Sequence, residues 1–287
     1  MIKQPKAIFL DMDGTILNHQ NLVTLKTKEV IDQLRRKGIL VFIATGRSFD
    51  EIEALVPEGF QVDGFISSNG MSAHVDGVAI MEHSLPLELV EKVIEKARKN
   101  KVYYELFPNK GSRFTLKEDR HYIEDEIREP RVETVGINEW MSRKEAIKNE
   151  IEWKDVIEGD KFSKFYCFSR SKEHINAWKK ELEELKKEID FTMSISSEHN
   201  VEIMVANVNK ATGIEYILNK HHLTANDIVG IGDSDNDIPM LKFVGHSVAM
   251  KNAPNHIKEL VDDVTDFTCD EDGVSQYLEK HFFKGSF

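Results

Sequence analysis

Residues 7–15 have the sequence AIFLDMDGT, in which four apolar residues are followed at once by two aspartates and a glycine. A short run of continuous apolar character is typical of a strand buried on both faces of a parallel sheet. We therefore predict a strand at 7–10. Ligands bind at the carboxyl ends of strands in such sheets, so Asp11 and Asp13 are candidate site residues. An ordinary turn would also use Asp13 and Gly14, because both residue types are common in turns.

The alternation of strands and helices continues outward from this stretch. Further apolar runs predict strands at 40–44, 64–68, 227–231 and 246–249. Helical periodicity predicts one helix that ends at Lys37 and Gly38, and others at 50–56, 212–220 and 237–243. Strands that alternate with helices favour parallel pairing. The predicted fold class is α/β, with a Rossmann-like core built on a parallel sheet.

The middle of the chain is more charged and less regular. Apolar residues at three- and four-residue steps predict amphipathic helices at Leu89–Ala97 and Ile175–Ile189, and 162–168 and 201–205 are predicted strands. We predict an inserted α+β domain at 84–205, and a core formed by 1–83 and 206–287.

Composition excludes several classes of function. The net charge of −12 argues against nucleic-acid binding, which needs clustered Lys and Arg. No apolar run approaches the roughly 20 residues of a membrane span. Cys167 and Cys269 lack the spacing of a metal or redox motif, which fits ordinary burial in a reducing compartment. No signal peptide precedes the first strand, so we expect a cytoplasmic protein. The oligomeric state is open.

Polar residues also follow three other predicted strands. These segments are Thr45-Gly46-Arg47, Ser68-Asn69-Gly70, and Gly232-Asp233-Ser234-Asp235-Asn236-Asp237. The first two could equally be a helix cap and a turn. The third is too rich in carboxylates for that, because their repulsion is costly unless a hard cation such as Mg²⁺ neutralises it. An EF-hand is set aside, since Ile238 stands where that loop requires glycine.

Together these motifs resemble the haloacid dehalogenase superfamily. The resemblance rests on the order of Asp11-Met-Asp-Gly-Thr, Thr45-Gly-Arg, Lys210 and Gly232-Asp-Ser-Asp-Asn-Asp237. Asp11 and Thr45 are 34 positions apart, whereas Thr45 and Lys210 are 165 apart. A long insert at that place is similar to Cof-type phosphatases with a C2-type cap, of the C2B kind. The segment Val248 to Ala253 is similar too, although Lys251 stands where the family often has glycine.

The resemblance implies a role for each matching residue. It implies Asp11 as the nucleophile and Asp13 as the general acid/base. It implies Thr45, Gly46 and Lys210 as phosphate-binding groups. Arg47, Asn69 and Asn236 would lie near the substrate. Mg²⁺ would be held by Asp11, the backbone carbonyl of Asp13 and Asp233, with Asp237 in support.

The expected function is magnesium-dependent hydrolysis of a small phosphomonoester, such as a sugar phosphate or a phosphorylated cofactor, through an aspartyl phosphate. A nucleophile is expected because one general acid contributes only about 10²–10⁴ of the acceleration needed. A phosphotransferase or mutase, a receiver-like switch and a non-catalytic phosphoester sensor are the alternatives. In the insert, Arg113 and Arg120 could contact the leaving group, but a solvated surface charge is the expectation for each.

Overall fold

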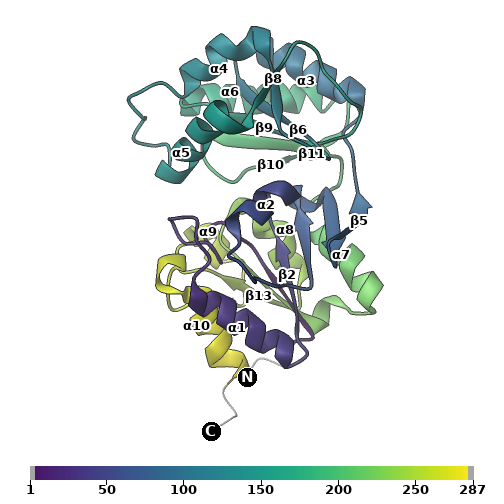
Figure 1. Cartoon of the computed structure of the whole chain (residues 1–287), viewed down its shortest axis with the longest axis vertical. Coiled ribbons are helices and arrows are strands. Elements are labelled where there is room, and N and C mark those ends of the chain that lie inside the picture. Colours follow the sequence, from purple (N-terminus) through teal and green to yellow (C-terminus); the bar gives the residue numbers. More distant parts are fainter. Residues whose placement is uncertain (1–3, 284–287) are drawn as a thin grey trace. The chain divides into compact units, whose positions relative to one another are not determined.

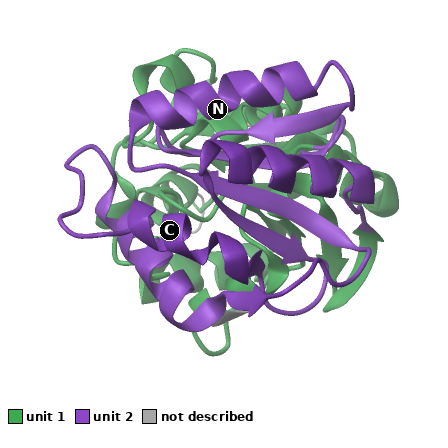
Figure 2. Cartoon of the chain, turned by 90° about the horizontal axis from the view of Figure 1, so that it is seen from above, with its two compact units in different colours: residues 1–81, 209–287 green, residues 82–208 purple. Residues whose placement is uncertain are grey.

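The computed structural model describes residues 4–283, apart from the side chains at 53 and 54. The chain divides into two units: unit 1 is residues 1–81 with 209–287, and unit 2 is residues 82–208 (Figure 2). The limits predicted for the insert, 84 and 205, differ from this division by two and three residues. That the units act as catalytic core and cap stays a prediction.

Unit 1 contains a sheet in the strand order β14-β13-β12-β1-β2-β3-β4-β5. Its strands are β1 (Ala7–Leu10), β2 (Leu40–Ala44), β3 (Gly64–Ser67), β4 (Ser72–Val75), β5 (Val78–Glu82), β12 (Ile228–Gly232), β13 (His246–Ala249) and β14 (Asp263–Val264). From β14 to β3 all neighbours are parallel, which confirms the α/β class. Because β1 lies between β12 and β2, the loops that follow these three strands meet at one edge.

The sheet is mainly parallel, and β4 adds an antiparallel strand that was not predicted. A tight turn at Ser68–Gly70 reverses the chain, so β4 pairs antiparallel with β3. Gly70 has a φ of +100°, and a Cβ there would lie 2.2 Å from the carbonyl oxygen of Asn209. Only glycine fits this close approach.

Helices cover both faces of this sheet (Figure 1). They are α1 (Leu25–Arg36), α2 (Phe49–Leu55), α7 (Lys210–His221), α8 (Ile238–Phe243), α9 (Asn255–Lys258) and α10 (Gly273–Phe282). Ile8 and Leu10 of β1 belong to an apolar cluster with α1 and α10, whereas Ala7 and Phe9 belong to one with α7 and α8. Burying a side chain as large as Leu or Ile contributes about 1.5–3 kcal/mol. All four residues of β1 are therefore apolar, and the first polar residue after them is Asp11.

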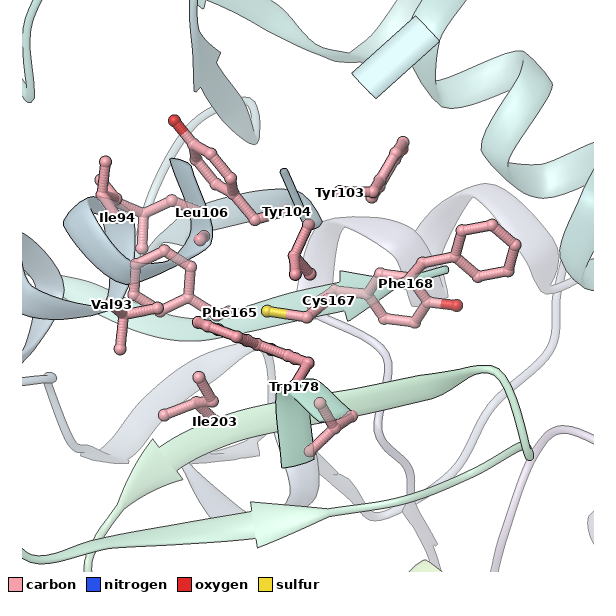
Figure 3. Packing of buried hydrophobic residues seen from close by; sticks show 14 of the residues in the cluster. Val93, Ile94, Tyr103, Tyr104, Leu106, Phe165, Cys167, Phe168, Trp178 and Ile203 are labelled. Atoms are coloured by element: carbon pink, nitrogen blue, oxygen red, sulfur yellow. The ribbon is translucent and has the colours of Figure 1, made fainter. Parts of the chain in front are cut away.

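Unit 2 is built on a second sheet in the order β10-β11-β9-β6-β7-β8. Its strands are β6 (Tyr103–Pro108), β7 (Phe114–Leu116), β8 (Glu152–Lys154), β9 (Phe162–Phe168), β10 (Phe191–Ser194) and β11 (Asn200–Val205), and its helices are α3 (Leu87–Asn100), α4 (Arg120–Glu126), α5 (Ile137–Glu145) and α6 (Lys172–Leu185). Trp178 of α6 packs with Phe165 and Cys167 of β9 (Figure 3). Cys167 is buried, as expected.

Arg113 is not a solvated surface charge, contrary to expectation. Its side chain is 8% exposed and its Nη1 donates to Glu105 Oε2 at 2.8 Å. Glu105 is fully buried on β6 and also pairs with Arg143. Burial raises the pKa of Glu105, but the two arginines outweigh this and leave the pKa lowered. Arg120 does lie at the surface, with its side chain 54% exposed.

Candidate active site

The loops at the carboxyl edge of the unit 1 sheet are tied to one another by backbone hydrogen bonds. Asp11 N–H donates to the carbonyl of Ile231, the last residue but one of β12. Thr45 N–H, directly after β2, donates to Ile66 of β3. The parallel ladders therefore extend one residue beyond β1 and β2. This extension sets the backbone from which the Asp11 and Thr45 side chains start.

Lys210 joins two of the predicted carboxylates. It is the first residue of α7, and its Nζ donates to Asp11 Oδ1 and to Asp237 Oδ1, each at 2.6 Å. The three side chains are 0–4% exposed. Burial lowers the pKa of Lys210, but the two carboxylates more than reverse this effect, so the ammonium form is held.

The loop 232–237 is closed by hydrogen bonds to the side chain of its last residue, Asp237. Asp237 Oδ2 accepts hydrogen bonds from the backbone N–H groups of Asp233 at 2.9 Å and Ser234 at 3.0 Å. With Oδ1 on Lys210, both oxygens of Asp237 have partners. A Cβ at Gly232 would lie 2.4 Å from Asp237 Cγ, so this turn needs glycine. The geometry favours Asp237 as a support for Lys210 and for the Asp233 backbone.

Asp233 completes a carboxylate cluster that fits a metal ion. One oxygen from each of Asp11, Asp233 and Asp237 lies within 4.8 Å of the others. In the described part of the chain, Asp233 Oδ1 is buried and has no hydrogen-bond partner. Such an atom is costly to bury unless something binds it. An oxygen-only donor set with one unsatisfied oxygen suits a hard divalent cation.

Burial and mutual repulsion raise the pKa values of two carboxylates in the cluster, Asp11 and Asp233. Burial, followed by the nearby Asp237 carboxylate, raises the pKa of Asp11 to about 7 even though Lys210 opposes the shift. Burial and then Asp11 raise the pKa of Asp233 well above its ordinary value. Without a cation, the pair therefore retains protons at a pH where isolated aspartates are ionised.

Asn252 is a residue of this site to which the sequence assigned no role. Its Nδ2 donates to Gly14 O at 2.8 Å and to Asp233 Oδ2 at 3.2 Å, and its Oδ1 accepts from Cys269 N–H at 3.0 Å. Asn252 therefore orients Asp233. The resemblance included Asn252, but nothing in residues 248–253 shows that its side chain reaches back to the first loop. Gly14 has a φ of +73°, and a Cβ there would lie 2.2 Å from Asp233 Oδ2.

Asp13 and Arg47 form a second pair at the same edge. Arg47 Nε donates to Asp13 Oδ2 at 2.8 Å and Nη2 donates to Asp13 Oδ1 at 2.5 Å. Two parallel bonds of this kind hold a carboxylate in a defined plane. The Asp13 side chain is 52% exposed, in contrast to buried Asp11. The loops after β1 and β2 thus bring together the predicted acid/base and a predicted substrate-proximal cation.

Thr45, Asn69 and Asn236 are linked through their loops. Asn69 N–H donates to Thr45 O at 2.9 Å, and Asn236 Nδ2 donates to Asn69 Oδ1 at 3.2 Å. Thr45 is fully buried and its Oγ1 accepts from Arg47 N–H at 3.1 Å, so it also caps its own loop. Gly46 lies between Thr45 and Arg47 in that loop. The structure thus brings Thr45, Asn69 and Asn236 together beside the loop that carries Gly46.

The parallel sheet and the lysine-bridged carboxylates at its edge define the chain as an α/β enzyme with a metal-compatible site. The family model of haloacid dehalogenase-like hydrolases matches residues 8–278, and the chain belongs to this family. It is a Cof-type phosphatase of the superfamily. Membership implies that activity depends on a metal, and the cluster of Asp11, Asp233 and Asp237 could bind one.

Individual relatives match over nearly their full length. The 5-amino-6-(5-phospho-D-ribitylamino)uracil phosphatase YwtE of Bacillus subtilis is 28% identical over 285 residues, which cover 96% of this chain and 97% of YwtE. A solved haloacid dehalogenase-like hydrolase from B. subtilis is 26% identical, with a TM-score of 0.81 and coverage of 96% and 99%. The subclass IIB sugar phosphatase BT4131 shares the fold, with 22% identity, a TM-score of 0.71 and coverage of 97% and 99%.

Proposed function

We propose that the chain hydrolyses phosphomonoesters of small metabolites in two steps, with Asp11 as the nucleophile, Asp13 as the acid/base and Mg²⁺ as the metal. The observation that carries this proposal is the contact of Lys210 with both Asp11 and Asp237 inside the carboxylate cluster. A lysine in this position orients the nucleophile in the resting enzyme and neutralises phosphoryl oxygens during the reaction.

Lys210 and the cluster prepare Asp11 for attack. Lys210 Nζ donates to Asp11 Oδ1 and so fixes the orientation of this carboxylate, one oxygen of which forms the bond to phosphorus. Asp11 attacks as a carboxylate, and a cation held in the cluster would favour this ionised form. Mg²⁺ held by Asp11, Asp233 and the Asp13 carbonyl would supply positive charge to the phosphoryl oxygens. As the bond from Asp11 to phosphorus forms, the bond from phosphorus to the leaving oxygen breaks.

Asp13 moves the proton in both steps. It donates a proton to the leaving oxygen in the first step. In the second step it takes a proton from the water that attacks phosphorus, and the bond from phosphorus to Asp11 breaks to release phosphate and the free carboxylate. In the resting structure the guanidinium group of Arg47 donates hydrogen bonds to both carboxylate oxygens of Asp13. We infer that Arg47 releases Asp13 when it turns to the substrate phosphate, because a phosphate oxyanion competes well for a guanidinium.

The remaining groups bind the phosphate and the leaving group. Thr45 and Gly46 offer a hydroxyl and a close backbone approach beside the cluster. Asn69 and Asn236 are joined by one hydrogen bond and would contact the substrate together. These roles are supported by the common edge that the loops share, and each of them stays a proposal.

The substrate class we propose is a small phosphorylated metabolite. The relatives YwtE and BT4131 are named for a ribitylaminouracil phosphate and for sugar phosphates respectively. No helix in residues 4–283 combines the length and the apolar character that crossing a bilayer requires. The cytoplasmic location stays a prediction.

Phosphate release from a panel of sugar phosphates and phosphorylated cofactors, with Mg²⁺ and with chelator, tests the proposal. Asp11→Asn should lower kcat at least about 10³-fold while the protein stays folded. Asp235→Asn is the matched control, because Asp235 lies in the same loop as Asp233 but contacts His256 at 2.7 Å. Metal-independent release, or equal rates in native and Asp11→Asn proteins, would contradict the proposal.

A further inference from the structure

Three side chains with different donor atoms converge in unit 1 outside the carboxylate cluster. They are His19, Cys269 and Asp270, and one donor atom of each lies within 4.8 Å of the others. His19 Nδ1 is 2.5 Å from Asp270 Oδ2 and 3.9 Å from Cys269 Sγ. The two loops that carry them are about 250 residues apart in the chain. The nitrogen, sulfur and oxygen donors therefore meet through the fold and not through local sequence.

The loop that carries His19 is ordered by its own hydrogen bonds. Asn18 Oδ1 accepts from Gln20 N–H at 2.9 Å and from Leu22 N–H at 3.0 Å, which closes the turn around His19. His19 N–H donates to Asp270 Oδ1 at 2.9 Å, so the two loops are also joined to each other. The imidazole thus starts from a fixed backbone.

The loop that carries Cys269 and Asp270 is a capped turn. Thr268 N–H and Oγ1 donate to Glu271 Oε2 at 3.1 and 2.9 Å, and Gly273 N–H donates to Thr268 O. Cys269 N–H donates to Asn252 Oδ1 at 3.0 Å. Because both loops are held before any ligand arrives, binding at the three side chains costs little ordering of the backbone.

The donor set selects a class of ion. Sulfur and imidazole ligands suit Zn²⁺ and similar transition ions, whereas Mg²⁺ prefers oxygen alone. Zinc bonds of about 2.0–2.3 Å place the donors of a tetrahedral site roughly 3–4 Å apart, which the 3.9 Å between Sγ and Nδ1 already satisfies. The 2.5 Å between Nδ1 and Oδ2 is a hydrogen-bond distance, so an ion would replace the proton there and widen the gap.

Exposure of His19 and Asp270 lets an ion and a water ligand reach the three donor atoms. The side chains of His19 and Asp270 are 62% and 49% exposed, whereas Cys269 is 5% exposed. Burial raises the pKa of the Cys269 thiol to about 11. Binding therefore releases the thiol proton to solvent as the bond from sulfur to the metal forms.

We propose that His19, Cys269 and Asp270 form a second cation site, which binds a Zn²⁺-class ion with water as the fourth ligand. The site is distinct from the oxygen-only cluster at Asp11 in its donors and in the ions it takes. It does not rest on the proposed phosphatase mechanism, because its donors take no part in that chemistry.

Titration of the full-length protein with Co²⁺ in saturating Mg²⁺ tests this site directly. Co²⁺ bound to a thiolate gives a near-ultraviolet charge-transfer band, whereas Co²⁺ on carboxylates gives none, so binding at Asp11 cannot imitate it. We expect the band in the native protein, its loss on addition of Zn²⁺, and its absence in Cys269→Ser. Cys167→Ser is the matched control and should keep the band, because that thiol is buried in the apolar core of unit 2.

His19→Ala keeps the thiol and removes the imidazole, so the Co²⁺ concentration at half-saturation should rise at least about tenfold. It also serves as the second variant if Cys269→Ser fails to fold, which circular dichroism would show. Absence of a thiolate band in the folded native protein would overturn the proposal. So would a band that survives in Cys269→Ser, or an unchanged half-saturation in His19→Ala.

Discussion

The position of Asp11 suits catalysis but destabilises the folded protein when no metal is bound. It is buried beside Asp237, whose carboxylate repels it, and Lys210 offsets part of this repulsion. Removing one partner from such a buried set leaves the others uncompensated, so each residue matters for the whole group. The same physics that favours a cation in the cluster destabilises the protein when the cation is removed.

Metal-free protein should become less stable as pH rises. The pKa of Asp11 is about 7 in the folded state, against 3.8 as the ordinary value. Between these values the folded state holds a proton that the unfolded state has lost, so the free energy of unfolding falls with rising pH. In chelator, Asp11→Asn should flatten this dependence and be about 1–3 kcal/mol more stable than the native protein near neutral pH.

Denaturant unfolding in chelator from about pH 5 to about pH 7.5 measures this effect. Asp235→Asn again provides the control, with the native slope expected. An identical slope in native and Asp11→Asn proteins would show that Asp11 does not hold the extra proton.

At the scale of elements, α7 carries the key cation at its first residue. Asn209 caps the helix: its Oδ1 accepts from Ala211 N–H at 2.9 Å and Thr212 N–H at 3.3 Å, and Thr212 Oγ1 accepts from Asn209 N–H at 3.1 Å. The cap thereby fixes the backbone of Lys210, whose side chain must reach Asp11. A cap is worth about 1 kcal/mol.

Asn209→Ala should therefore lower the free energy of unfolding by about 1 kcal/mol and also lower kcat. Asn209→Ser retains a cap acceptor and should keep most of both. Thermal unfolding and steady-state kinetics measure the two effects. If Ser is as damaging as Ala, the cap does not position Lys210.

Some elements could be predicted from the sequence residue by residue, and others could not. The strands 7–10 and 40–44 are as predicted, because burial on both faces leaves an uninterrupted apolar run. The strand 162–168 is also as predicted, although Ser163 and Lys164 interrupt its apolar run. The helix predicted at 212–220 begins earlier, at Lys210, because a polar cap and a buried lysine break the apolar pattern. The helix predicted to reach Ile189 ends at Leu185, and Ile189 packs against the core from the turn that follows.

The site residues that the sequence could not predict are those placed by long-range polar contacts. The carboxylates Asp11, Asp13, Asp233 and Asp237 could be selected because they follow predicted strands. Lys210 could be selected only through the family resemblance, because it lies before the predicted start of its helix. Nothing local predicts that Asn252 bonds Asp233 or that Arg113 is buried against Glu105. The catalytic roles that the resemblance implies stay predictions until they are measured.

At the scale of the whole molecule, metal binding should slow amide hydrogen exchange in unit 1. The cluster draws on the loops after β1 and β12 and on α7, all of which belong to unit 1, whereas β6 and β9 pair with each other within unit 2. On addition of Mg²⁺, amide hydrogen exchange should slow at 11–15 and 233–237 and stay unchanged in β6 and β9. Equal slowing in both units, or none at 11–15, would contradict a metal site confined to unit 1.

Trapping of the intermediate tests the central claim most directly. Asp13→Asn keeps the nucleophile but lacks the base for the second step, so an aryl phosphate, whose leaving group needs no acid, should phosphorylate it and leave the phosphoryl group in place. Acid quench in Mg²⁺ and mass spectrometry should find one added phosphoryl group on the peptide that contains Asp11. A phosphoryl group on another residue, or none on folded, Mg²⁺-loaded protein, would contradict the assignment of Asp11 as the nucleophile.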